Sequence, residues 1–210
     1  MYKIKKPIIK NELIKKDIND VSFNTEDKIY DTLFIGDDPN NTINDVEFNG
    51  CTFKNINFSN SLVKDSDFID CIFDTCNLSN VEINDKLILR CEFVNCSLIG
   101  SCIINSSIKD VSFNSCNMEY SNYSLKTDKC LFDNCNMKNI RLFENTFKNT
   151  YFDKCNFNFA EIYESSLNGI DLSNCDINDI NIDTKSIKGA IVDLNGAIEL
   201  SKLLGIKVKF

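Results

Sequence analysis

The chain has 210 residues, of which 43% are hydrophobic and 26% charged, and its formal net charge is −8. No apolar run approaches the roughly 20 residues of a membrane span, and residues 1–16 lack the apolar core of a signal peptide. We therefore expect one soluble, cytoplasmic domain. The chain has no histidine and lacks the glycine-rich, phosphate-binding and nucleophile-elbow motifs, which argues against an enzyme.

The N-terminal segment differs in charge from the rest of the chain. Residues 1–16 contain six lysines and one glutamate, whereas residues 17–190 contain 28 acids and 14 bases, a net charge of −14. Imperfect repeats surround Val21, Phe23 and Phe34. The segment 35–42, rich in turn-forming residues, interrupts them and predicts a loop.

From Asp45 to Ala190 a large apolar residue recurs at almost every fifth position. A helix repeats near 3.6 and a strand at 2, so neither element explains a period of five. A small or β-branched residue precedes each large one by two positions, and polar residues fill the other three. This pattern predicts a chain that turns a corner every five residues and points one large and one small side chain inward.

A longer period of twenty residues lies on the shorter one. The segment Cys71–Leu78 returns as Cys91–Leu98, then as Val111–Met118 and, after a step of nineteen, as Cys130–Met137. Four five-residue sides therefore make one coil of a square solenoid whose coils stack on one another. The register predicts one file of stacked rings, formed by Phe53, Phe73, Phe93, Phe113, Phe132 and Phe152.

Ten of the eleven cysteines occupy the small inward slot, and Cys102 does not. Neighbouring coils would hold these thiols at roughly the 4.8 Å inter-strand spacing, with parallel side chains that suit packing better than a disulfide. With no CxxC motif and no histidine, we expect free thiols that act as small apolar side chains, with no metal and no cofactor.

Charge is segregated by side of the square. The side that carries Val63, Ile83, Ile103, Tyr123, Leu142, Ile162 and Ile182, here the acidic side, has seven acids against Lys64 and Arg141. Another side, here the basic side, has eight bases against five acids and carries Phe48, Phe68, Ile88, Ile108, Phe147, Leu167 and Ile187. The rod carries roughly one net negative charge per 3 Å, against one per about 1.7 Å in duplex DNA, which argues against direct DNA binding.

The segregation of charge by side has two explanations. One is chance unevenness among the charges that any soluble rod needs. The other is a face complementary to a basic groove that normally holds DNA, with candidate residues Asp65, Glu82, Asp85, Glu144, Glu161 and Glu164.

The nineteen-residue step is a second candidate site. It falls in the stretch Ser124, Leu125, Lys126, Thr127, Asp128 and Lys129, where one corner must bulge or tighten. A break in a rigid scaffold can hold a recognition loop, although tolerated drift explains it equally well.

The tail leaves the repeat. Asp193 can cap a short helix, Gly205 can end it, and residues 206–210 alternate like a strand. We expect residues 1–190 to form the solenoid and residues 191–210 to cap it. The apolar tail could also pair with its own copy about a two-fold axis, through Leu194, Ile198, Leu200, Leu203, Leu204, Ile206 and Val208.

The repeat resembles that of the pentapeptide-repeat proteins, as in Cys76-Asn-Leu-Ser-Asn80 and Cys135-Asn-Met-Lys-Asn139. The tail segments Ile187–Leu194 and Ala197–Val208 are similar to the end of the quinolone-resistance (Qnr) branch of that family. The resemblance implies a right-handed quadrilateral β-helix with a short C-terminal α-helix that dimerises the rod end to end. It also implies binding to DNA gyrase or topoisomerase IV and protection of these enzymes from quinolones. The alternative is a solenoid that serves as a general protein-interaction or structural scaffold, without a topoisomerase partner.

Overall fold

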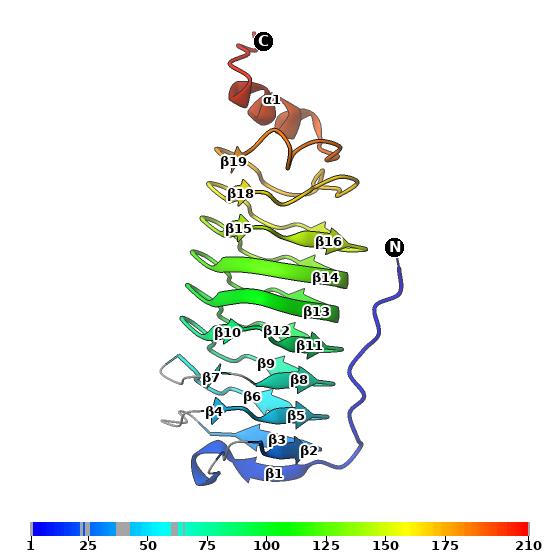
Figure 1. Ribbon diagram of the computed structural model, residues 1–210, viewed down its shortest axis with the longest axis vertical. Coiled ribbons are helices and arrows are strands. Elements are labelled where there is room, and N and C mark those ends of the chain that lie inside the picture. Colours follow the sequence, from blue (N-terminus) through cyan, green and yellow to red (C-terminus); the bar gives the residue numbers. More distant parts are fainter. Residues whose placement is uncertain are drawn as a thin grey trace.

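The computed structural model describes residues 2–21, 23, 26–36, 43–59, 63–64 and 66–209. The chain forms a β-solenoid of about eight coils that ends in one helix (Figure 1). All pairings between the described strands are parallel, and successive coils are offset by 20 residues in the regular region, as in Phe93 opposite Phe73 and Phe113. The predicted quadrilateral β-helix is confirmed.

The strands lie on three of the four sides. The basic side consists of β2 (Lys28–Tyr30), β5 (Glu47–Asn49), β8 (Asp67–Ile69), β11 (Leu87–Leu89) and β16 (Thr146–Lys148). The next side consists of β1 (Ile14–Asp17), β3 (Thr32–Ile35), β6 (Thr52–Lys54), β9 (Ile72–Asp74), β12 (Glu92–Val94) and β17 (Tyr151–Asp153). The acidic side consists of β4 (Ile43–Asn44), β7 (Val63–Lys64), β10 (Glu82–Asn84), β15 (Arg141–Phe143), β18 (Glu161–Tyr163) and β19 (Asn181–Ile182).

Two long strands, β13 (Cys102–Asn114) and β14 (Asn122–Asp133), run continuously through these three sides. The remaining side is a ladder of single bridges that starts at Asn57 and ends at Asp176. A 3-10 turn, η1 (Ile18–Asp20), follows β1. The coils therefore begin near Ile14, well before the regular repeat, and Ile18 and Phe34 belong to the core.

Most corners form because the second residue after the large inward residue adopts a left-handed conformation. Asn95, Asn134 and Asp70 have φ of 53°. Asn, Asp and Gly tolerate this conformation best, which explains their frequency in the repeat. The corner polarity thus follows from backbone geometry as well as from exposure.

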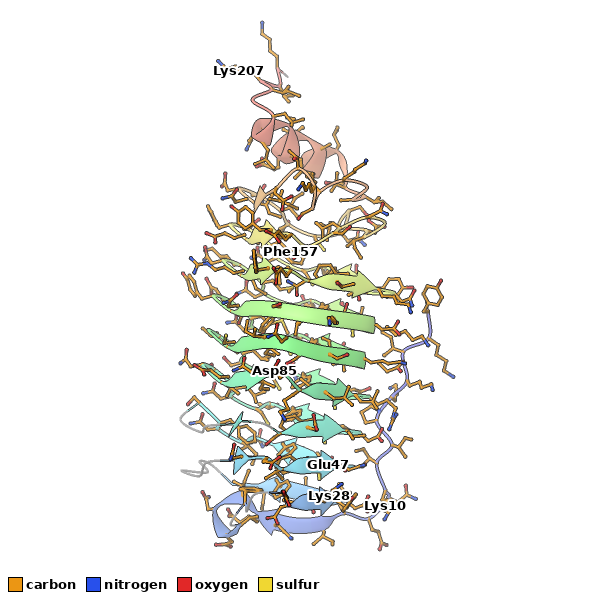
Figure 2. All side chains as sticks on the ribbon, in the orientation of Figure 1. Lys10, Lys28, Glu47, Asp85, Phe157 and Lys207 are labelled. Atoms are coloured by element: carbon orange, nitrogen blue, oxygen red, sulfur yellow. The ribbon has the colours of Figure 1, made fainter. Side chains whose placement is uncertain are left out.

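The core is a column of rings. Phe93 is 4% exposed and stacks on Phe73 and Phe113, with centroid distances of 4.6 and 4.7 Å and interplanar angles of 1° and 13°. The predicted file is confirmed and is one ring longer than expected, because Phe34 stacks on Phe53 at 5.1 Å. Phe157, labelled in Figure 2, is also buried inside the rod.

A second column, of polar residues, runs inside the corner between the acidic and basic sides. Asn145 is 3% exposed and accepts a hydrogen bond from the Leu125 backbone N–H at 2.8 Å. Its side-chain amide donates to the carbonyls of Tyr123 and Phe143, at 2.8 and 3.2 Å. Ser106 and Ser165 serve neighbouring coils in the same way.

The N-terminal segment does not enter the coils. Residues 2–10, here called the strap, run along the outside of the stack. They start at the level of β16 and run toward the first coils, where the chain enters β1 (Figure 1). Lys10 forms an ion pair of 2.5 Å with Asp31 near the first coils, close to the Lys28–Glu47 pair of 3.0 Å (Figure 2).

At the other end, α1 (Leu194–Leu203) covers the last coil. Asp193 is its N-cap, as predicted, and Gly205 follows its end with φ of 71°. The predicted strand over residues 206–210 is wrong for residues 206–209, which form no strand and are exposed beyond the helix; residue 210 lies outside the described residues. In the part of the chain that the structure describes, no helix is long and apolar enough to cross a membrane.

Candidate functional site

The acidic side is a flat parallel sheet. Its strands pair in the order β10, β13, β14, β15, β18 and β19, with Glu82 opposite Cys102 and Arg141 opposite Glu161. Side chains that point inward on this sheet are Ile83, Ile103, Tyr123, Leu142 and Ile162, all buried. Their neighbours in sequence therefore point to solvent.

Three of the predicted acids occupy the corner column of this side. Asp85, Glu144 and Glu164 have φ of 57°, 55° and 50°, and all three are exposed. A residue at such a corner projects away from the coil, so its carboxylate is open to a partner. The rigid sheet behind these corners fixes the spacing between the charges.

The acids fall into two clusters rather than one row. Glu82 and Asp85 lie on the coil of β10, whereas Glu144, Glu161 and Glu164 lie on the coils of β15 and β18. Of the two intervening coils, one has the uncharged Asn105 at this corner, and the other has only the uncharged Ser124 between Tyr123 and Leu125. Three coil steps separate Asp85 from Glu144, or about 14 Å at the inter-strand spacing.

Two of the acids on this side are already engaged. Glu161 accepts a hydrogen bond from Arg141 Nε at 3.0 Å, in an exposed ion pair. The Asp183 carboxylate accepts hydrogen bonds from the Ser186 hydroxyl at 2.6 Å and from backbone N–H groups, and these lower the pKa of Asp183 to about 2. Asp183 therefore serves a local turn. Asp65 lies outside the described residues.

The nineteen-residue step tightens a corner. Residues 124–129 lie within β14, paired with β13 before it and with β16 after it, so they form no projecting loop. Ile103 is opposite Tyr123 and Ser106 is opposite Leu125, which places the missing residue at Ser124. Thr127 takes the large inward position, is 3% exposed and shares a hydrogen bond of 2.6 Å with the Thr150 hydroxyl. The segment 35–42 lies outside the described residues from residue 37 onward.

The tail residues divide into two groups. Ile198 and Leu200 are partly buried, and Leu200 packs against the core of the last coil. In contrast, a group of apolar tail residues is exposed: Leu194 at 77%, Leu203 at 43%, Leu204 at 68%, Ile206 at 53% and Val208 at 43%. The helix is thus a cap whose outer surface remains apolar.

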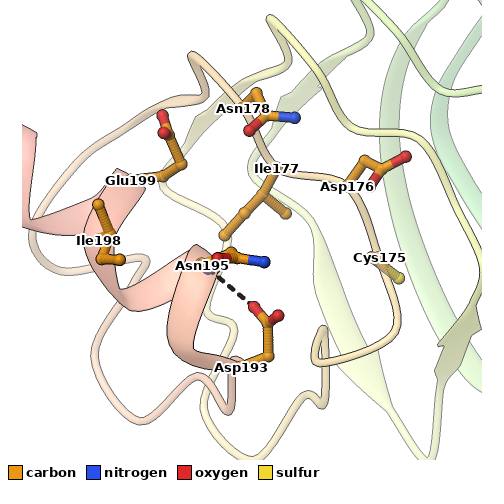
Figure 3. Close-up of a pocket in the computed structure, with 9 residues that line it drawn as sticks. Cys175, Asp176, Ile177, Asn178, Asp193, Asn195, Ile198 and Glu199 are labelled. Carbon is orange, nitrogen blue, oxygen red and sulfur yellow. Dashed lines mark hydrogen bonds between the residues drawn. The ribbon is translucent and has the colours of Figure 1, made fainter. Parts of the chain in front are cut away.

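A shallow pocket lies where α1 meets the last coil (Figure 3). Asp176, Asp193 and Glu199 contribute carboxylates to its wall. Asp193 is committed to the helix start, because its carboxylate accepts from the Gly196 N–H at 2.8 Å, and Glu199 binds Lys202 at 2.6 Å. Among the residues that the structure describes, no three His, Cys, Asp or Glu side chains are placed to hold a metal ion.

All eleven cysteines are free thiols, nine of them buried and two, Cys102 and Cys175, half-buried. The buried thiols donate to carbonyls of the preceding coil, as Cys96 does to Phe73 at 3.4 Å. Burial raises the pKa of the Cys130 thiol to about 12. Burial, with a smaller contribution from Glu82, raises the pKa of Cys102 as well.

We expect the native chain to react slowly with a thiol reagent, because a thiol reacts through its thiolate and the core excludes the reagent. Labelling should be measurable at Cys102 and Cys175 and should disappear when both are replaced with serine. The denatured chain should label at all eleven positions. Rapid labelling of further thiols in the native chain would show that the cysteine columns open readily.

Comparison with known proteins bears on the repeat. The sequence profile described as "Pentapeptide repeats (8 copies)" matches residues 146–179. The chain contains pentapeptide repeats. The resemblance to pentapeptide-repeat proteins expected from the sequence is therefore confirmed for this segment, and the coils outside it keep the same twenty-residue register. No curated protein has a sequence that matches the chain significantly.

Several solved pentapeptide-repeat structures are similar to this solenoid. A trypsin-treated variant of QnrB1, a plasmid-mediated fluoroquinolone resistance protein, is 15% identical, with 87% of this chain and 99% of that chain covered and a TM-score of 0.42. Full-length QnrB1 is 21% identical, with coverages of 92% and 95% and a TM-score of 0.35. HetL, involved in heterocyst differentiation regulation in the cyanobacterium Nostoc, is 14% identical, with coverages of 81% and 92% and a TM-score of 0.32. Likenesses this low carry no information about partners.

Proposed function

We propose that this chain is a cytoplasmic, non-enzymatic protein that imitates the charge of DNA, binds DNA gyrase or topoisomerase IV through its acidic side, and protects these enzymes from quinolones. The observation that carries the proposal is the corner column of the acidic side. Asp85, Glu144 and Glu164 project from fixed left-handed corners of one sheet and are exposed. The resemblance of the tail sequence to the Qnr branch supports the same partner.

A protein groove that holds duplex DNA is lined by basic residues placed to meet phosphates. Carboxylates on a rigid sheet can occupy such a groove without losing much conformational freedom on binding. The two acidic clusters would act as separate anchors about 14 Å apart, and residues 101–105 and 121–125, which are uncharged on this side, would span the groove between them without pairing with its basic residues. Glu161 would contribute less than the corner acids, because Arg141 already neutralises it.

The test is a gyrase supercoiling assay with ciprofloxacin, with and without the purified chain. Wild type is expected to restore supercoiling, and the variant Asp85→Lys, Glu144→Lys, Glu164→Lys is expected to lose this effect. The three side chains lie outside the core, so the variant should keep the melting temperature of wild type. Binding of wild type should also weaken with salt, because exposed charges are screened beyond about 8 Å at physiological ionic strength.

The matched control makes the same change in net charge on another side. Glu92→Lys, Asp133→Lys and Asp153→Lys alter residues of the opposite side of the square, the side that begins with β1. This control should retain protection. Equal losses from both triple variants would show that the partner responds to total charge rather than to the acidic side. If wild type neither binds nor protects, the chain is instead a general interaction scaffold.

We further propose that the chain forms an end-to-end dimer through the exposed apolar surface of its tail. Leu203→Asp with Leu204→Asp should give a folded monomer in light scattering at micromolar concentration, because burying unpaired charges in an interface is costly. Leu200→Asp is the informative contrast. Leu200 packs on the last coil, so this change should lower thermal stability as well. A wild-type chain that is monomeric at these concentrations would contradict the dimer.

A further inference from the structure

The strap is held to the solenoid by backbone groups that meet one corner column of the basic side. The Lys5 N–H donates to Asp110 Oδ1 at 3.0 Å, and the Ile8 N–H donates to Asp70 Oδ1 at 3.0 Å. Further along, the Tyr2 N–H donates to the Tyr151 hydroxyl at 2.7 Å. In this view the strap runs down the edge of the stack beside β16, β11 and β5 (Figure 1).

The spacing of the donors along the strap matches the spacing of their acceptors along the solenoid. Successive donors on the strap are three residues apart, which is roughly 9–10 Å in an extended chain. Their acceptors on the solenoid, Asp70 and Asp110, are two coils apart, which is also about 10 Å. Arg90 occupies the corner between them, and its guanidinium pairs with Asp70 through two bonds of 2.6 Å. An extended segment therefore fits the corner column in register.

The hydrogen bonds that hold the strap come from its backbone N–H groups, whereas its side chains are exposed or at most half-buried. Ile8 is 70% exposed and Tyr2 is 60% exposed, whereas the acceptors Asp70 and Asp110 are 5% and 3% exposed. Hydrogen bonds to carboxylates are stronger than those to neutral acceptors, so Asp70 and Asp110 hold the strap more firmly than neutral side chains would. Gly50 belongs to the same column, and a Cβ there would approach the Ile8 carbonyl to 3.7 Å.

We propose that this corner column is a binding site for an extended, lysine-containing peptide segment of a partner protein, and that the chain's own strap occupies it as an intramolecular competitor. Recognition through backbone N–H groups does not depend on one sequence, as in other cases where an extended peptide is bound by its main chain. The site requires free N–H groups three residues apart and favours a lysine beside Asp31, a corner residue of the same column that pairs with Lys10 of the strap. The strap itself meets both conditions.

Ile4, Pro7 and Ile9 of the strap are half-buried and none of its side chains is fully buried, so the strap can be displaced more easily than a coil, since local stability depends on such contacts. The tether nevertheless holds the strap at an effective concentration in the millimolar range, so a partner must outcompete it. Weakening the strap without shortening the chain should therefore open the site to peptides added from outside.

The test uses the full chain with Lys5→Pro and Ile8→Pro. Proline removes the two donor N–H groups but suits an extended conformation. The control is Lys3→Pro with Lys6→Pro, two positions at which the described contacts include no hydrogen bond from the backbone N–H. Hydrogen exchange by mass spectrometry should show residues 2–10 released in the first variant and protected in wild type and control, while the coils remain protected in all three.

The probe is a fluorescent peptide with the sequence of residues 1–13, followed by anisotropy. It should bind the Lys5→Pro, Ile8→Pro variant at least about tenfold more tightly than wild type or the control, because the tethered competitor is gone. The same peptide with proline at positions 5 and 8 should not bind. A peptide that keeps only the lysines and Pro7, with alanine elsewhere, should bind within about threefold of the natural sequence.

Two results would overturn the proposal. If the strap stays protected in the Lys5→Pro, Ile8→Pro variant, or if the released site fails to bind the natural peptide, the backbone contacts do not form a peptide site. If the natural peptide binds and the alanine–lysine peptide does not, the site is specific for the chain's own strap and does not bind a segment of a partner protein.

Discussion

Replacing Phe93 with alanine is expected to lower the free energy of unfolding by about 3–5 kcal/mol. Phe93 lies in the middle of the ring file, stacked on both sides at 4.6 and 4.7 Å. Each coil rests only on its neighbours, so the coils cannot easily close the cavity. Denaturant titration followed by circular dichroism measures the loss.

Phe143→Ala provides the control for Phe93. Phe143 is a ring on the same solenoid that is 46% exposed, so its removal should cost well below 1 kcal/mol. A Phe93→Ala variant as stable as Phe143→Ala would mean that the ring file contributes little to stability, although it is well ordered.

Asn145→Ala is expected to cost about 3 kcal/mol, although it removes only a small polar side chain. It would leave the Leu125 N–H and the carbonyls of Tyr123 and Phe143 without their buried partner. Each unsatisfied buried group costs roughly 1–3 kcal/mol, and partial rearrangement reduces the sum. Thermal and chemical denaturation measure the effect.

Asn145→Ser is the matched variant. Serine performs this task at Ser106 and Ser165, where its hydroxyl accepts from the neighbouring coil and donates to a carbonyl. It should recover more than half of the stability lost in Asn145→Ala. If serine is as damaging as alanine, the amide fills space that the tightened corner at Ser124 creates, and its hydrogen bonds are secondary.

The sequence predicted the core because the five-residue repeat shows which side chains point inward, as it does for Phe93 and Phe132. It could not place the nineteen-residue step, since several alignments of residues 124–129 satisfy the period equally well. Only the pairing of Leu125 with Ser106 shows that the corner residue is missing and that Thr127 faces the core.

The candidate site was predicted in part. The five-residue period alone predicted that Asp85, Glu144 and Glu164 lie on one side. The division of the acids into two clusters depends also on Arg141 and on the uncharged corners. The alternation of residues 206–209 suggested a strand, yet no neighbouring strand among the described residues lies beside them to pair with. The docking of the strap leaves almost no trace in sequence, because its donors are backbone N–H groups that every residue except proline carries.

The contact between Tyr2 and Tyr151 joins residues 149 positions apart in a molecule whose coils pair residues about twenty apart. Synthesis proceeds toward the C-terminus, so residues 2–8 are made before the coils that carry their acceptors. Asp70, Asp110 and Tyr151 are added in that order, and the strap can settle only in the same order, from Ile8 back toward Tyr2. The strap, although it is made before its acceptors, therefore reaches its native position only after the coils up to Tyr151 exist, and until then its lysines are free in solution beside a growing acidic rod.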